Sequence, residues 1–153
     1  MRLVRATPVE CEAMAQAHVQ AFHDKAWRDD EFEDLLDGEG IYGFLADHEA
    51  TPLGVVLCRI AAGEVEVLTV GVTPAARRRG VGQALMVAAL AVAREAGVGE
   101  AFLEVAVDND AAIALYGLLG FETAGLRKAY YDLGPAGYAD ALVMRLDLNA
   151  AAA

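Results

Sequence analysis

A basic, glycine-containing loop is the part of the chain whose residue types and spacing point most specifically to chemistry. It runs Arg77-Arg78-Arg79-Gly80-Val81-Gly82-Gln83, between a valine-rich segment and a predicted helix. Backbone N–H groups at a helix start attract an anion, and the helix dipole strengthens that attraction. The glycines let the backbone approach a phosphate without a Cβ in the way, and the arginines add charge-assisted hydrogen bonds. The loop therefore predicts a phosphate-binding site.

Two better-known nucleotide motifs fit this loop poorly. A Walker loop ends in Gly-Lys-Ser/Thr, whereas Gly82 is followed by Gln83 and Ala84. The dinucleotide fingerprint needs a small third residue where Leu85 stands, so a dinucleotide-binding module is disfavoured. A plain glycine turn with a solvated basic cluster is the remaining alternative. Three adjacent arginines in such an acidic chain count against it.

Glu104 is the first candidate for a general base. It lies inside an apolar strand segment, where a carboxylate is costly unless it is paired or takes part in a reaction. Desolvation there would raise its pKa toward that of an amine that it deprotonates. The alternative is a glutamate near a strand end that points to water.

Glu66 is the second candidate base, on the strand before the phosphate loop. Glu64 and Glu66 alternate as on a solvent-facing surface, but Leu68 and Val70 continue that face and are apolar. Either the face turns inward or a bulge near Gly71 shifts the register. Glu66 is therefore predicted to act as a base or to hold a water.

The elements that must position these residues form a mixed pattern. Thr7-Pro8-Val9-Glu10 is typical of a helix start, with Thr7 as cap and Glu10 completing a capping box. We expect helices from there to Phe22, over Val81–Ala96 with Gly97 as its left-handed cap, and from Asp110 to near Gly120. We expect strands at Arg2–Arg5, Ile41–Asp47, Leu53–Ile60, Glu64–Val72, Ala101–Val107, Phe121–Leu126 and Ala139–Leu148.

This pattern predicts an α/β fold with a single mixed, mostly antiparallel sheet flanked by helices. Early strands form hairpins around a turn at His48–Pro52, and the later part alternates strand and helix. The 153 residues suit one domain, predicted over residues 1–148, with a frayed tail at 149–153.

Composition narrows the possible partners. The formal net charge is -11 and 56% of residues are hydrophobic, which disfavours both nucleic acid as a partner and intrinsic disorder. A basic peptide or a cationic amine suits that charge; acidity that only aids solubility is the alternative.

No membrane-spanning run or signal peptide is apparent, and Cys11 and Cys58 suggest no disulfide framework, so we expect a cytoplasmic protein. Scattered histidines give no case for a metal.

The chain resembles the Gcn5-related N-acetyltransferase superfamily, whose acetyl-CoA pyrophosphate loop has the pattern Arg77-x-x-Gly80-x-Gly82. The resemblance covers nearly the whole chain, from about Arg2 to Leu148. Within the superfamily the chain is most similar to the bacterial ribosomal-protein-alanine N-acetyltransferases. The segments that carry this likeness are Leu103-Glu104-Val105, Asn109-Asp110-Ala111-Ala112-Ile113-Ala114-Leu115-Tyr116, Leu119-Gly120-Phe121, Tyr130-Tyr131 and Asp140-Ala141.

The resemblance implies the acyl-CoA N-acyltransferase fold, acetyl-CoA as cofactor and direct acyl transfer to an amine. It implies that Glu104 is catalytic, that Tyr116 protonates the leaving thiolate, and that Asn109 binds the pantetheine arm. The residues of Val70–Val72, namely Val70, Gly71 and Val72, would face the oxyanion through backbone N–H groups. Tyr130 and Tyr131 match paired tyrosines in the family's substrate loop, and Trp27 is a further predicted substrate-binding residue. Plain alternatives stay open: a core tyrosine at Tyr116, an N-cap at Asn109 and hairpin packing for the tyrosine pair.

The acceptor implied by the resemblance is the N-terminal alanine of a small-subunit ribosomal protein. An α-amine has a pKa of about 7.7–8.0 against about 10.4 for lysine, so one modest base serves it more easily. Three departures from the family pattern, at Ala106, Asp108 and Arg28, put the peptide specificity in doubt. A small-molecule amine is the alternative acceptor, and a non-catalytic acyl-CoA-binding interaction subunit is the alternative of another class.

Overall fold

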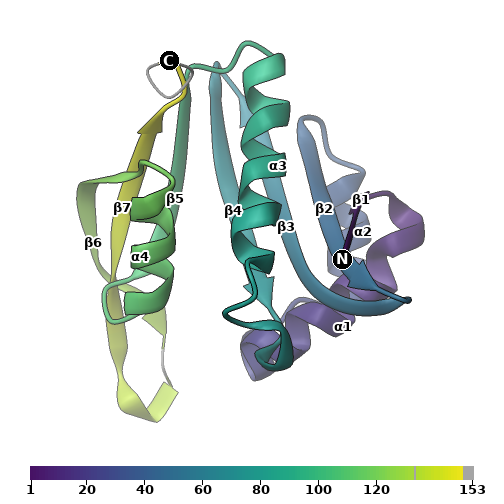
Figure 1. Cartoon of the computed structure of the whole chain (residues 1–153). Helices are drawn as coiled ribbons and strands as arrows, with labels where there is room; N and C mark the ends of the chain where they lie inside the picture. Colours follow the sequence, from purple (N-terminus) through teal and green to yellow (C-terminus); the bar gives the residue numbers. More distant parts are fainter. Residues whose placement is uncertain (133, 150–153) are drawn as a thin grey trace.

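A seven-stranded sheet forms the centre of the molecule (Figure 1). The computed structural model describes residues 1–132 and 134–149. The strands are β1 (Arg2–Arg5), β2 (Ile41–His48), β3 (Thr51–Ala61), β4 (Glu64–Val72), β5 (Glu100–Ala106), β6 (Glu122–Asp132) and β7 (Tyr138–Asp147). Their order is β1-β2-β3-β4-β5-β7-β6, and β4–β5 is the parallel pair in an otherwise antiparallel sheet. The predicted mixed, mostly antiparallel sheet is confirmed.

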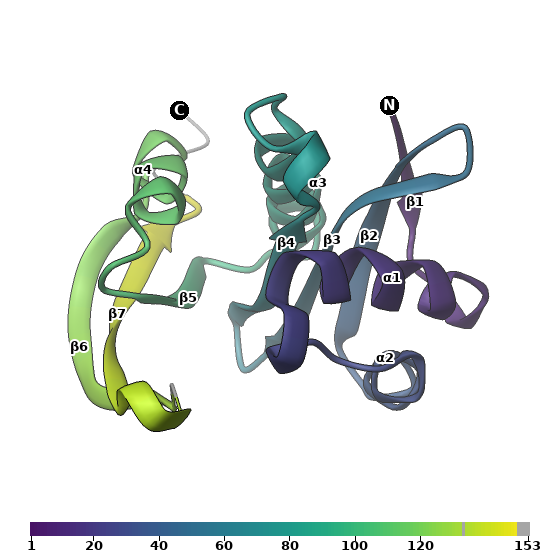
Figure 2. The ribbon, with the colours of Figure 1, turned by 90° about the horizontal axis from the view of Figure 1, so that it is seen from below.

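The helices cover the two faces of this sheet unequally. Helices α3 (Val81–Glu95) and α4 (Asp110–Leu118) lie on one face, whereas α1 (Cys11–Phe22) and α2 (Asp29–Leu36) lie on the other (Figure 2). Helices α1 and α2 pack against the β2–β4 half of the sheet, through a cluster that includes Met14, Phe32 and Leu57. A larger cluster under α3 and α4 joins both halves of the sheet. None of the helices described is long and apolar enough to cross a membrane.

Strands β4 and β5 pair only at their beginnings. The parallel register joins Glu64–Glu66 to Glu100–Phe102, and beyond it the two strands separate (Figures 1 and 2). A strand directs its backbone groups alternately to both sides. Some N–H and C=O groups of β4 beyond Glu66 therefore face the gap instead of a neighbouring strand.

A β-bulge at Leu68 shifts the register of β4, so that side chains after it alternate out of step with those before it. Leu57 of β3 pairs with Thr69 and Cys58 pairs with Val67, so Leu68 is the extra residue. Of the two alternatives predicted for this strand, an inward turn of the face or a bulge near Gly71, the structure has a bulge, but at Leu68. Gly71 serves another purpose, because a Cβ there would lie 2.7 Å from the ring of Phe22. The glycine lets the end of α1 approach β4 closely.

Most predicted element bounds agree with the structure to within a few residues. Thr7 and Glu10 form the predicted capping box, although the first turn is a 3-10 helix over Pro8–Glu10. The β2–β3 turn is tighter than predicted, because Glu49 and Ala50 both adopt positive φ angles and close it. The tyrosine segment belongs to β6 instead of a loop. Of the predicted tail, residues 150–153 lie outside the described residues.

Candidate functional site

The basic loop ends at the N-terminus of α3, at the end of the molecule where β4 and β5 have separated (Figure 1). Among the residues that the structure describes, no side chain caps this helix start. Arg77 donates from Nε to the Val72 carbonyl at 3.2 Å, which braces the loop against the end of β4. Arg78 and Arg79 are exposed and form no ion pair with any described residue. The loop thus combines open helix N–H groups with two unpaired cations.

Gly80 and Gly82 were predicted to let the backbone approach a phosphate, and the structure shows a further requirement for glycine at each position. Gly80 has a φ of 80°, a left-handed conformation that favours glycine, and its missing Cβ would meet open space. At Gly82 a Cβ would lie 3.2 Å from the Leu115 side chain of α4. Gly82 therefore lets the first turn of α3 pack against α4, in addition to keeping the backbone accessible.

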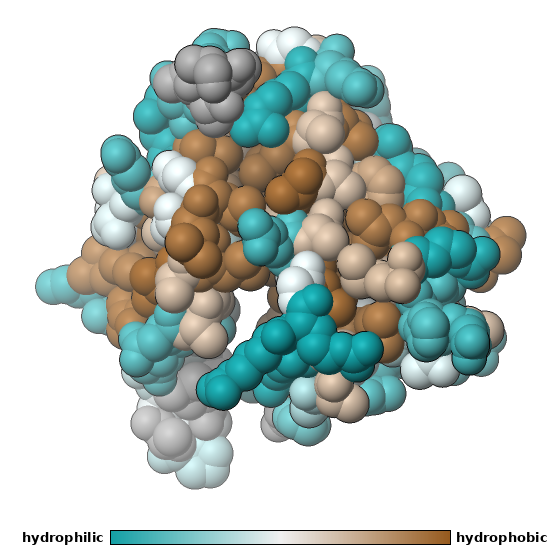
Figure 3. Space-filling view, in the orientation of Figure 1, coloured by the Kyte–Doolittle hydropathy of each residue, from teal (hydrophilic) through white to brown (hydrophobic). Residues whose placement is uncertain are grey.

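A cleft of about 690 Å³ lies between the separated parts of β4 and β5. Figure 3 shows the face that carries α3 and α4, with a hollow below its centre that lies between apolar side chains on one side and strongly hydrophilic side chains on the other. The cleft brings together Trp27, Val70, Glu104, Asn109, Tyr116, Tyr130 and Tyr131, which are predicted site residues from segments far apart in sequence. Its lining also includes His18, Phe22, Lys25 and Thr69, which the sequence did not single out.

Glu104 lies on the cleft wall with a side chain 23% exposed, so it is less buried than expected. Arg127 of β6 donates to its carboxylate at 2.7 Å and stacks over the ring of Tyr130 at 4.0 Å. Contact with Glu104 is also the main cause that raises the pKa of Tyr130. The Tyr131 hydroxyl donates to the Glu104 backbone carbonyl at 3.3 Å. The carboxylate is thus paired, with the tyrosine pair held around it.

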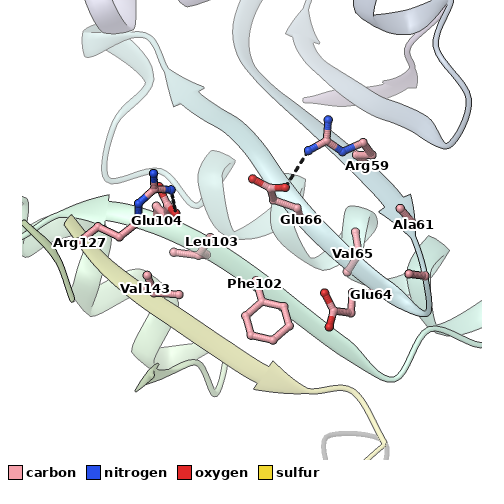
Figure 4. A pocket seen from close by; sticks show the side chains of 11 residues that line it. Arg59, Ala61, Glu64, Val65, Glu66, Phe102, Leu103, Glu104, Arg127 and Val143 are labelled. Carbon is pink, nitrogen blue, oxygen red and sulfur yellow. Dashed lines mark hydrogen bonds and ion pairs between the residues drawn. The ribbon is translucent and has the colours of Figure 1, made fainter. Parts of the chain in front are cut away.

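Glu66 occupies a different position. Its carboxylate accepts a hydrogen bond from Arg59 at 2.9 Å, its side chain is 51% exposed, and it does not line the cleft. It lines an adjoining cavity of about 480 Å³ on the sheet face that α1 and α2 leave open. Figure 4 shows this cavity with both ion pairs, Glu66–Arg59 and Glu104–Arg127. Only Glu104, with its neighbour Leu103, lines both spaces.

Tyr116 and Asn109 approach the cleft from α4. Asn109 caps the helix by accepting the Ala112 N–H at 3.2 Å, so its structural role is present. Tyr116 is buried at 7% exposure, and desolvation, with a smaller contribution from Tyr131, raises the pKa of its phenol. A raised pKa keeps the phenol protonated, as a proton donor requires, although it also makes the phenol a weaker acid.

An aromatic group from α1 and the following segment closes the opposite wall. The ring centroid of His18 lies 4.5 Å from that of Phe22, 5.1 Å from that of Trp27 and 5.3 Å from that of Phe32. His18 is 2% exposed, and burial lowers its pKa to about 4. The sequence had left His18 unassigned because no pairing motif surrounds it. Its only sequence signal is its place one helical turn before Phe22.

Cys58 is the one other group with nucleophilic chemistry considered from the sequence. It is buried beneath α3, and desolvation raises the pKa of its thiol to about 12. The thiol lies outside the lining of the cleft. It therefore behaves as a core side chain.

The chain matches the family model "Acetyltransferase (GNAT) family" over residues 10–121. It is 48% identical over 84 residues to N-alpha-acetyltransferase RimI of Mycobacterium tuberculosis, covering 55% of this chain but only 49% of that relative. It is 30% identical to the [Ribosomal protein bS18]-alanine N-acetyltransferase of Escherichia coli, covering 85% of this chain and 86% of the relative. The crystal structure of the Escherichia coli ribosomal-protein-S18-alanine N-acetyltransferase superposes with a TM-score of 0.87 at 27% identity, covering 96% and 93% of the two chains. The chain belongs to the acetyltransferase (GNAT) family.

Proposed function

We propose that this chain transfers an acetyl group from acetyl-CoA to the N-terminal α-amine of a protein, such as a small-subunit ribosomal protein in the cytoplasm. The observation that carries the proposal is the separation of β4 from β5. It opens one cleft that contains Glu104 and Tyr116, and the strand β4 that lines this cleft continues into the basic loop before α3.

The residues of the loop fit a diphosphate. The N-terminus of α3 has no side-chain cap, and Arg78 and Arg79 have no acidic partner among the described residues. Backbone N–H groups over Gly80–Gln83 would hold the phosphate oxygens, and Asn109 would hold the pantetheine arm. When bound, acetyl-CoA supplies the thioester that an amine can attack.

The residues of the cleft then supply the proton transfers. Glu104 removes a proton from the acceptor amine, directly or through one water. Backbone N–H groups within Val70–Val72 stabilise the oxygen on which negative charge develops, because this part of β4 faces the gap. Tyr116 would donate its phenol proton to the thiolate of the cofactor. Glu66 stays a predicted base, but its place outside the cleft and its greater exposure favour Glu104.

Two features support a peptide N-terminus as the acceptor. Trp27, Tyr130 and Tyr131 provide flat walls on both sides of the cleft, which suit an extended chain. The net charge of -11 attracts basic partners. The bS18-alanine acetyltransferases named above act on a ribosomal protein, as their names state.

The test is an acetylation assay that compares an Ala-started basic peptide with a panel of small amines. We expect mass spectrometry to locate the new acetyl group on the peptide α-amine, at a higher kcat/KM than for any small amine. Preference for a small amine would indicate the alternative acceptor class. Acetyl-CoA binding without turnover of any acceptor would instead indicate an interaction subunit.

The cofactor loop has its own test. Changing Arg78→Glu places a negative charge beside the diphosphate, so we expect acetyl-CoA affinity to fall by about tenfold, the scale of one exposed charge-assisted hydrogen bond. Isothermal titration calorimetry measures it. Arg145→Glu, far from the loop in a β5–β7 ion pair, is the charge-matched control. Equal affinities for wild type and Arg78→Glu would contradict the loop assignment.

A further inference from the structure

Thr69 is a polar side chain on the cleft wall that the proposed reaction does not use. It lies on β4 directly before Val70. The bulge at Leu68 turns its side chain to the α1 face, since Thr69 pairs with Leu57, which packs beneath α1 and α2. Without the bulge, strand alternation would direct Thr69 toward α3. The extra residue, Leu68, therefore determines that the Thr69 hydroxyl points to the α1 face.

A chain of contacts then brings His18 to that hydroxyl. Gly71 leaves room for Phe22 at the end of α1, and the ring of Phe22 packs, tilted, against that of His18 one turn earlier on the same helix face. As a result the Nε2 atom of His18 lies 2.9 Å from Thr69 Oγ1. The close packing of α1 on β4 thus fixes the distance between the His18 imidazole and the Thr69 hydroxyl.

The other nitrogen of His18 settles the direction of this hydrogen bond. The backbone N–H of Trp27 donates to Nδ1 at 2.9 Å, and a backbone N–H can only donate. Nδ1 must therefore be unprotonated, and the neutral imidazole carries its hydrogen on Nε2. Since burial keeps His18 neutral, Nε2–H donates and Thr69 Oγ1 accepts.

The hydrogen of the Thr69 hydroxyl is then left to donate elsewhere. Within residues 1–132 and 134–149, this hydroxyl has no hydrogen-bond partner other than His18. Thr69 lines the cleft, so the free donor faces the space where an acceptor must lie. A hydroxyl with its lone pair engaged by a fixed N–H is oriented as a donor.

On the basis of the proposed function, we infer that Thr69 donates a hydrogen bond to the carbonyl next to the acceptor amine, and that His18 is its positioning residue. An amine that attacks beside the Val70 backbone places its own substituents next to the preceding residue, Thr69. A peptide N-terminus carries a carbonyl on the amine-bearing carbon, whereas a simple alkylamine does not. This contact therefore selects α-aminoacyl acceptors over simple amines.

The experiment measures kcat/KM for two acceptors, alaninamide and isopropylamine, which share the amine-bearing carbon and methyl group and differ in the carboxamide. Thr69→Val keeps the shape of the side chain and removes the hydroxyl, whereas Thr69→Ser keeps the hydroxyl. We expect Thr69→Val to lower the alaninamide-to-isopropylamine ratio of kcat/KM by about tenfold, the scale of one hydrogen bond. Thr69→Ser should retain most of the ratio.

Two further variants separate positioning from folding. His18→Gln places an amide N–H that can still donate to Thr69 but has no acceptor at the position of Nδ1, where the Trp27 N–H donates, so we expect an intermediate loss of the ratio. Thr51→Val is the matched control, an exposed strand threonine outside the cleft, and should leave the ratio unchanged. Thermal unfolding of each variant reports folding separately, because a loss of folded protein lowers both rates and not their ratio.

The outcomes are distinct. A ratio unchanged in Thr69→Val, with wild type active on alaninamide, overturns the role of Thr69 and leaves the proposed function standing. An equal loss for both acceptors likewise overturns carbonyl recognition. Wild-type protein that acetylates isopropylamine but not alaninamide overturns both the inference and the proposed function.

Discussion

The cleft between β4 and β5 and the adjoining cavity on the sheet face share Leu103 and Glu104, yet they differ in everything else that lines them. Aromatic rings, a neutral histidine and hydroxyl groups line the cleft. The cavity has Arg59, Glu64, Glu66 and Arg127 on an open face (Figure 4). The same strands thus build a partly desolvated space where they separate and a solvated charged surface where they pair.

This difference separates two carboxylates that look alike in sequence. Both Glu66 and Glu104 sit in apolar strands, and both accept a hydrogen bond from an arginine. Glu104 is 23% exposed and reaches the cleft, whereas Glu66 is 51% exposed and does not. Position relative to the point of separation, and not residue type, distinguishes a candidate base from a surface ion pair.

The strongest way to break this comparison is to neutralise each carboxylate. We expect Glu104→Gln to lower kcat/KM for an Ala-started peptide by about 10²–10⁴-fold, the usual contribution of a general base. Glu66→Gln, the matched control, should change it by about twofold at most, as surface substitutions do. Steady-state kinetics measures both, with calorimetry to verify unchanged acetyl-CoA affinity. The reverse order of effects would assign the base to Glu66.

Burial in the cleft should also appear in the stability of the protein. The pKa of His18 is about 4 in the folded chain against 6.5 unfolded, so below pH 6.5 the unfolded chain binds a proton that the folded chain does not. We expect the free energy of unfolding to fall by about 3 kcal/mol from this group as pH drops from 6.5 to 4.

Denaturant unfolding of wild type and His18→Gln across that pH range isolates the contribution, because carboxylates titrate in both proteins. The difference between them should shrink as the pH falls. His48→Gln, at an exposed histidine, serves as control and should run parallel to wild type. Parallel curves for His18→Gln and wild type would show that His18 is protonated as easily in the folded chain.

A substitution of Tyr116, which is buried in the cleft, tests its role as the proton donor. Its raised pKa makes it a weak acid, so we expect Tyr116→Phe to lower kcat by about tenfold, less than the loss of a well-matched acid. KM for the acceptor should change little, because the hydroxyl acts on the leaving group. A change in KM alone would instead place the hydroxyl in acceptor binding.

The smallest effect is expected in the cavity. Arg59 and Glu66 form a half-exposed ion pair, with side chains 47% and 51% exposed. We expect Arg59→Gln to lower the free energy of unfolding by about 0–1 kcal/mol, as exposed pairs do, with kcat/KM for the peptide unchanged. A large kinetic effect would show that the charged face takes part in acceptor binding and would weaken the distinction between the two spaces.

Local signals in the sequence identified most of the elements. The Thr7–Glu10 capping box, the left-handed Gly97 and the alternation of Glu64 and Glu66 at the start of β4 depend on near neighbours, and the structure confirms each. The basic loop was also placed correctly at the start of α3, because glycine spacing and helix onset are local properties.

The partners across the fold could not be predicted in the same way. Arg127 on Glu104, His18 on Thr69 and Leu115 beside Gly82 each join segments distant in sequence. The alternative of a bulge in β4 was placed near Gly71 instead of Leu68, because a glycine suggests a bulge, whereas Gly71 makes room for Phe22. Whether a glycine is needed for such close packing depends on which helix lies above the strand.

The sequence by itself determined the loop, the elements and the residue types that could transfer protons, because hydrogen-bonding patterns within a helix or strand need only neighbouring residues. Only the tertiary structure decided which carboxylate enters the cleft and which hydroxyl is free to donate. Those choices depend on where β4 and β5 stop pairing and on how closely α1 packs, and both are set by contacts between distant segments.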